Sequence, residues 1–214
     1  VILSHAHVFG APRASVRSGL LYPNAAERMQ QLSQLFPHDQ IEMFTALRNP
    51  AAFLPAVFRA SPQESVDEFL GGVDPADVRW SDMLAEVRAA APRVNITVWC
   101  NEDTPLIWAE IIRELAGLEH NEKIIGGFDV LGDIMSPEGM QRFRGYLKTH
   151  PAMTEMQKRR VIAAFLDKYA LEDEIEEELD MPGWTEDLVD ELTEVYDDDM
   201  LRIQKIPGVT LIAP

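Results

Sequence analysis

Four short hydrophobic runs, separated by long helical patterns, constrain the fold of this chain more than any other feature. The runs are rich in β-branched and aromatic residues, which favour strands. A strand followed by a helix and then by another strand needs a crossover connection, and crossovers produce a parallel sheet. The runs lack clean apolar–polar alternation, as expected for strands that are covered on both faces. They are VILS (1–4), IEMFTAL (41–47), VNITVWC (94–100) and VTLI (209–212).

Capping residues and prolines mark where the intervening helices begin and end. Ser61-Pro62-Gln63-Glu64 is typical of a capping box and predicts a helix that ends at Gly71-Gly72. We predict a single α/β domain over 1–214, with a mostly parallel sheet flanked by helices and 136–205 as a mostly helical C-terminal part. Further helices are expected over 25–36, 81–91, 136–149 and 151–170, after Asn49, from Thr104 to Gly117, and from Thr185.

The charge of the chain excludes several classes of partner. The formal net charge is -17, from 36 acidic and 19 basic residues, so nucleic acid and anionic membranes are not expected as partners. No apolar stretch reaches the roughly 18 residues of a membrane span. Cys100 is the single cysteine, which rules out an intramolecular disulfide and favours a cytoplasmic location. The acidic stretches 171–180 and 196–200 are expected to be solvated helical faces, in preference to a calcium site at 197–199.

Polar residues follow the first three runs at the point where each run ends. Because parallel strands end at one edge of a sheet, we expect these groups to gather there. Ser4 and Glu102 are predicted to contact a substrate, and His5 and His7 are candidate catalytic residues. The groups are Ser4, His5 and His7, then Arg48 and Asn49, then Asn101, Glu102 and Asp103.

Arg48 is the most informative of these residues. Asn49 is a good N-cap and Pro50 a good first helical residue, so a helix is expected to start directly after the arginine. Free amides at that helix terminus, together with a guanidinium, predict a phosphate or sulfate site. The alternative is that Arg48 pairs with an acid such as Glu102 and braces two strand ends.

The segment ALRNPAAFLPAVF (46–58) resembles the strand–turn–helix of the sulfotransferase family. In that family an arginine, with a serine eight residues later, holds the 3′-phosphate of 3′-phosphoadenosine 5′-phosphosulfate, the sulfate donor. Arg48, Asn49 and Pro50 match this motif, and Ala56 falls on the serine position. VILSHAHVF and YDDDMLRIQKIPGVTLI also resemble family elements. The resemblance implies a P-loop-like three-layer fold, that donor as cofactor, and a small-molecule or glycan acceptor with a hydroxyl or amine.

The chain departs from the family pattern in two respects. The family's Pro-Lys-x-Gly-Thr-Thr type loop is absent, as is any G-x-x-x-x-G-K-[ST] loop, and Ala56 has no hydroxyl. Two interpretations remain open: the donor loop lies upstream of Val1, or the protein is a degenerate relative. The second interpretation predicts a catalytically inactive interaction module whose acidic helices, 171–200, contact a partner. A homodimer is also considered.

Three roles are considered for His5 and His7. They are hydrogen-bonded loop residues, or one of them is the general base that deprotonates the acceptor, or both bind the metal of a hydrolase. The sequence shows no third metal ligand, so no metal is expected. Glu102 and Asp103 are also base candidates, but the segment NEDTP is more typical of a polar turn before a helix.

Overall fold

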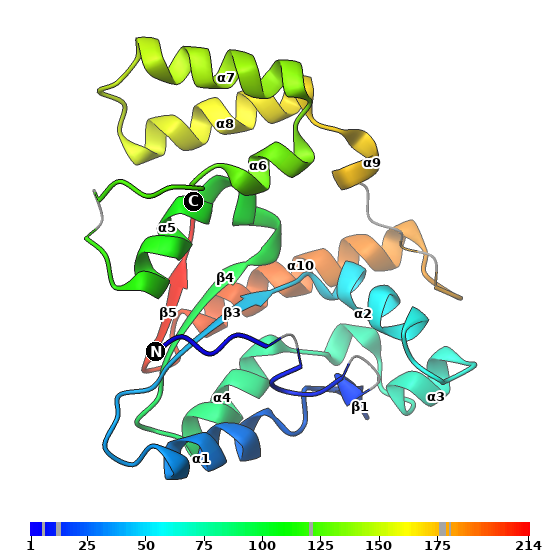
Figure 1. Cartoon of the computed structure of the whole chain (residues 1–214). Coiled ribbons are helices and arrows are strands. Elements are labelled where there is room, and N and C mark those ends of the chain that lie inside the picture. The colour runs from blue at the N-terminus through cyan, green and yellow to red at the C-terminus, as the bar shows by residue number, and fades with distance from the viewer. Residues whose placement is uncertain (6, 12–13, 120–121, 176–178, 180) are drawn as a thin grey trace. The chain divides into compact units, whose positions relative to one another are not determined.

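The main sheet consists of three parallel strands in the order β3–β4–β5 (Figure 1). The computed structural model of the chain is an α/β structure with 55% helix, and helices flank this sheet. The strands coincide with three of the four predicted runs: β3 (Glu42–Leu47), β4 (Asn95–Cys100) and β5 (Val209–Ile212). The structure describes residues 1–5, 7–11, 14–119, 122–175, 179 and 181–214.

The predicted strand over 1–4 is wrong. Residues 1–5 are exposed and form no strand, and the side chain of Leu3 is 73% exposed. Apolar composition alone does not make a strand, because fixing the backbone costs entropy that only pairing and burial offset. The first paired residues are instead two short antiparallel strands, β1 (Val16–Arg17) and β2 (Leu20–Leu21), in which Val16 lies opposite Leu21.

The chain forms two compact units. The first unit comprises 1–98 and 178–211, and the second comprises 99–177 and 212–214. The predicted helical part 136–205 is therefore divided between them. In the first unit lie α1 (Ala25–Leu35), α2 (Pro50–Arg59), α3 (Val66–Leu70), η2 (Pro75–Asp77), α4 (Trp80–Ala90) and α10 (Glu186–Ile203). In the second lie η3 (Asn101–Asp103), α5 (Thr104–Ala116), α6 (Asp129–Ile134), α7 (Pro137–Thr149), α8 (Glu155–Tyr169) and α9 (Glu172–Ile175).

Local capping explains most helix boundaries. The hydroxyl of Thr185 accepts a hydrogen bond from the Leu188 amide at the start of α10, as predicted. The predicted capping box at 61–64 is wrong, because the hydroxyl of Ser65 caps the shorter helix α3. Helix α8 likewise starts after Thr154, whose capping box with Gln157 replaces the expected start at 151. Among the described helices, none is both long and apolar enough to cross a membrane.

Each unit has its own hydrophobic core. In the first unit α4 packs on α1, and α10 packs on α2 and α4. In the second unit the aromatic ring of Phe143 is fully buried, and its centroid lies 5.2 Å from that of Phe128 and 5.5 Å from that of Phe165. These edge-on contacts fasten α7 to α8 and to the start of α6. The surrounding core residues are Leu131, Met135, Met140 and Ile162.

A buried carboxylate joins α10 to α4. Asp199 is 2% exposed and accepts hydrogen bonds from the backbone amides of Trp80 (2.8 Å) and Ser81 (3.0 Å), and from the Ser81 hydroxyl. It therefore satisfies the free amides at the start of α4, a helix whose own N-cap residue provides no side-chain hydrogen bond. The expected solvated face at 196–200 is correct for Asp197 and Asp198, which are exposed, and wrong for Tyr196, Asp199 and Met200, which are buried.

We predict that Asp199→Ala lowers the free energy of unfolding by about 2–4 kcal/mol, because it leaves three buried donors without an acceptor. The neighbouring exposed change Asp198→Ala is the matched control, with an expected effect within about 0.5 kcal/mol. Urea unfolding followed by circular dichroism measures both. Equal effects of the two substitutions would contradict the capping role of Asp199.

Candidate functional site

The turn between β3 and α2 is held by side chains from distant parts of the first unit. It contains Arg48 and the N-cap Asn49, and its carbonyl groups would otherwise be buried without donors. Helices α4 and α10, together with Trp184, provide the partners. The Tyr196 hydroxyl donates to the Leu47 carbonyl (3.0 Å), Trp80 Nε1 to the Arg48 carbonyl (2.8 Å), Trp184 Nε1 to the Ala51 carbonyl (2.8 Å), and Asn49 Nδ2 to Thr193 Oγ1 (2.9 Å).

The amides at the start of α2 are already satisfied. Asn49 Oδ1 accepts from the Ala51 amide (2.9 Å), and the Asn49 carbonyl accepts from the amides of Ala52 (3.0 Å) and Phe53 (2.8 Å). Pro50 has no amide hydrogen to offer. The expectation of free amides at this helix terminus is therefore wrong, because Asn49 caps the helix from within the turn. An anion at this turn would therefore have to be bound by side chains, chiefly by the guanidinium of Arg48.

Arg48 lines a cavity of about 240 Å³ in the first unit. The cavity brings together three of the predicted site residues, His7, Arg48 and Ala56, which come from an N-terminal loop, the β3–α2 turn and α2. Ala56 lies on α2, eight residues after Arg48, and both residues line this cavity. The described lining residues are His7, Gly10, Ser15, Tyr22, Arg48, Phe53, Ala56, Val57 and Ala60.

Aromatic rings form one wall of this cavity and its support. The ring centroid of Tyr22 lies 6.1 Å from that of Phe53 and 6.1 Å from that of Trp80, and the last two rings are 5.2 Å apart. Tyr22 has a φ angle of 43°, which is strained for a residue with a side chain. Its amide donates to the Ser15 carbonyl (2.6 Å), so the ring packing and this hydrogen bond hold the strained backbone in place.

The two histidines are in contact, but they differ in position. The His7 amide donates to His5 Nδ1 (3.0 Å), and the ring centroids are 5.7 Å apart. Both side chains are exposed, and Arg28 Nη1 donates to the His7 carbonyl (3.2 Å), which ties this loop to α1. His7 lines the cavity. Three other predicted site residues, Ser4, His5 and Asn49, are not among the described residues that line it.

Glu102 belongs to the second unit, on the short helix η3, and is exposed. The neighbouring Asp103 is half-buried, and burial raises the pKa of its carboxyl, with a smaller contribution from the negative charge of Glu102. Asp103 therefore keeps its proton to a higher pH in the folded state than in the unfolded state. Its ionisation lowers the free energy of unfolding as the pH rises from the ordinary value of 3.8 through the folded pKa.

We predict that Glu102→Gln lowers the pKa of Asp103 toward its ordinary value without reaching it, because the change removes the neighbouring charge and leaves the burial. The carboxyl carbon shift of Asp103, followed by nuclear magnetic resonance against pH, measures this pKa. Glu114→Gln, an exposed change on α5, is the control and should leave the titration unchanged. An unaltered Asp103 titration in Glu102→Gln would contradict the assigned cause.

Several site residues were not predicted from sequence. Tyr22, Phe53 and Ser15 line the cavity, yet none follows a predicted strand. The pair Tyr22-Pro23 after Gly19 was the available signal, since it marks a tight turn. Among the described residues, no group of three or more His, Cys, Asp or Glu side chains could hold a metal ion. Comparisons with protein-family models, with curated proteins and with solved structures found no match to this chain.

Proposed function

We propose that the first unit is a sulfotransferase-like domain in which Arg48 holds the 3′-phosphate of 3′-phosphoadenosine 5′-phosphosulfate. The observation that supports this function best is that Arg48 and Ala56, the two positions of the resemblance, line one cavity. A guanidinium binds a phosphate through charge-assisted hydrogen bonds, which are about twice as strong as neutral ones. The rings of Tyr22 and Phe53 offer apolar surface for a sugar or a base beside it.

We further propose that the fold is of the P-loop-like three-layer type. A parallel sheet with a guanidinium just after one strand is compatible with a P-loop-like three-layer fold, in which ligands bind beyond the carboxyl ends of the strands. Residues 1–214 contain no Pro-Lys-x-Gly-Thr-Thr type loop. These residues would therefore bind the 3′ side of the donor, through Arg48, and provide no loop of that type for its 5′ side.

His7 is the proposed general base. As the acceptor oxygen or nitrogen forms its bond to the donor sulfur, the bond between that sulfur and the 5′-phosphate oxygen breaks, and adenosine 3′,5′-bisphosphate leaves with the electron pair. The acceptor hydroxyl or amine loses a proton in the same reaction. The imidazole ring of a histidine is the side-chain group that most often takes up such a proton as a general base. His7 lines the cavity, while His5 Nδ1 accepts from the His7 amide and so positions it. The acceptor would be a small molecule or a glycan.

We predict that the protein binds adenosine 3′,5′-bisphosphate and that Arg48→Gln weakens this binding at least about tenfold, because hydrogen bonds to charged groups are worth roughly 1.5–3 kcal/mol. Isothermal titration calorimetry measures both dissociation constants. Arg202→Gln, an exposed change in the last turn of α10, removes the same charge and should leave the affinity unchanged. Absence of binding to the unmodified protein, or equal affinity of Arg48→Gln, would overturn the proposal.

A second candidate function is a catalytically inactive interaction module, and the methyl group of Ala56 at the cavity favours it. The exposed carboxylates of α10, among them Glu191 and Asp198, would then contact a partner. Ala56→Ser separates the two candidates. If the cavity is built for a 3′-phosphate, the added hydroxyl should tighten bisphosphate binding about tenfold in the same calorimetric experiment. No binding by either form would favour the interaction module.

A further inference from the structure

Arg113 on α5 carries a buried charge in the second unit. The residue is 8% exposed, and a guanidinium keeps its proton at any pH at which proteins are folded. Its Nε donates to the Glu122 carbonyl (2.9 Å). Its Nη1, which is fully buried, has no hydrogen-bond partner among the residues that the structure describes. An unsatisfied N–H of a charged group is costly in a protein interior, so this atom indicates a missing acceptor.

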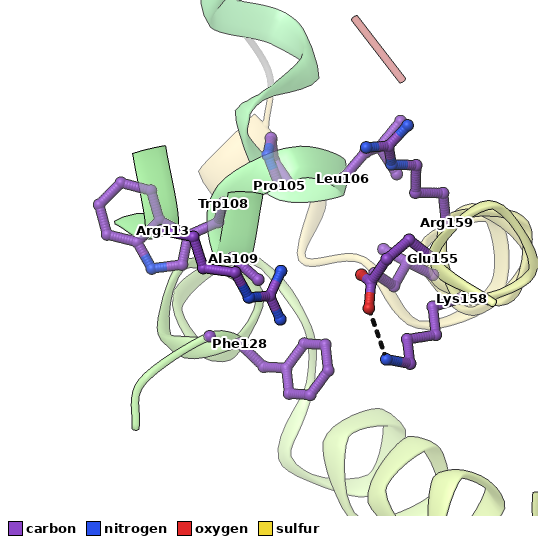
Figure 2. A pocket seen from close by; sticks show the side chains of 11 residues that line it. Pro105, Leu106, Trp108, Ala109, Arg113, Phe128, Glu155, Lys158 and Arg159 are labelled. Atoms are coloured by element: carbon purple, nitrogen blue, oxygen red, sulfur yellow. Dashed lines mark hydrogen bonds and ion pairs between the residues drawn. The ribbon is translucent and has the colours of Figure 1, made fainter. Parts of the chain in front are cut away.

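The side chain of Arg113 lines a cavity of about 40 Å³ that lies within the second unit. Figure 2 shows the guanidinium entering from α5 on one side, and Glu155, Lys158 and Arg159 entering from α8 on the other. The ring of Phe128 also lines this cavity. A cavity of roughly 10–15 Å³ is enough to hold one water molecule. The cavity therefore has room for one small polyatomic ion, and no room for a nucleotide.

The charges around this cavity favour an anion. Three cationic side chains and one carboxylate line it, in a chain with 36 acidic and 19 basic residues. Lys158 pairs with Glu155 at 2.7 Å. Arg159 pairs with Glu110 and also donates to the Ala213 carbonyl (3.2 Å). Of the three cationic lining residues, Arg113 is the one that forms no ion pair with a described residue. A trapped water would complete its hydrogen bonding and leave the charge uncompensated.

We propose that this cavity is a binding site for one small tetrahedral oxyanion, phosphate or sulfate. Arg113 Nη1 donates to one of its oxygens, and Lys158, on the opposite wall, exchanges part of its contact with Glu155 for a second oxygen. The site lies in the second unit and involves none of the residues assigned to the nucleotide in the first. It is therefore independent of the sulfotransferase-like function.

The test is a titration of the full chain with inorganic phosphate, and separately with sulfate, at ionic strength held constant with potassium chloride. Nuclear magnetic resonance follows the Arg113 Nε–H signal, which its hydrogen bond to Glu122 keeps observable. We expect a saturable shift with both ions. Adenosine 5′-monophosphate, whose phosphate carries a bulky ester, should produce none. A linear response equal to that of chloride, or saturation by the nucleotide, would overturn the proposal.

Substitutions complete the experiment, with binding followed by calorimetry. Arg113→Gln should weaken phosphate binding at least about tenfold. Lys158→Met, a change at a half-buried position, should weaken it about threefold and gives the answer if Arg113→Gln does not fold. Arg160→Gln, exposed on the same helix and absent from the described lining residues, is the control and should have no effect. Arg48→Gln should also leave this site intact. Unchanged affinity in Lys158→Met and Arg113→Gln would contradict the assignment.

Discussion

The hydrogen bonds from distant side chains to the β3–α2 turn are the interaction on which the candidate site of the first unit depends. The indole of Trp80 and the hydroxyl of Tyr196 each satisfy a carbonyl of the turn that carries Arg48. A buried carbonyl without a donor costs about 1–3 kcal/mol, so α4, α10 and this turn stabilise one another. Asp199 completes the arrangement, because it joins α10 to the start of α4. The position of Arg48 is thus determined by helices that are far from it in sequence.

Local signals in the sequence were sufficient for the elements that carry the site. β3 was predicted from its β-branched and aromatic residues, and α2 from Asn49 and Pro50, because strand propensity and helix capping depend on neighbouring residues. Ala56 was assigned to the site only through the resemblance to the sulfotransferase family, and it lines the same cavity as Arg48. The roles assigned to His7, Arg48 and Ala56 remain predictions.

The features that sequence could not provide all depend on tertiary partners. The run 1–4 has strand composition, but no other strand pairs with it among the described residues. Three consecutive aspartates look alike in sequence, and only the packing of α10 on α4 makes Asp199 a capping group. The same limit applies to Arg113, whose burial and missing acceptor are properties of the folded second unit. Asn49 was predicted as an N-cap. Because its side chain accepts a hydrogen bond from an amide at the start of α2, that amide is not free to bind an anion as had been expected.

Each unit therefore contains a cavity that is lined by arginine, Arg48 in the first unit and Arg113 with Arg159 in the second, in a protein whose formal net charge is -17. Such a surface slows the approach of anions at low salt, and screening beyond about 8–10 Å weakens this effect at physiological ionic strength. The phosphate-binding role of Arg48 is tested most directly by a crystal structure of the protein grown with adenosine 3′,5′-bisphosphate. We predict a phosphate within hydrogen-bond distance of the Arg48 guanidinium, with Trp80 and Tyr196 still donating to the turn. A guanidinium directed away from the cavity, or a turn without these two hydrogen bonds, would contradict it.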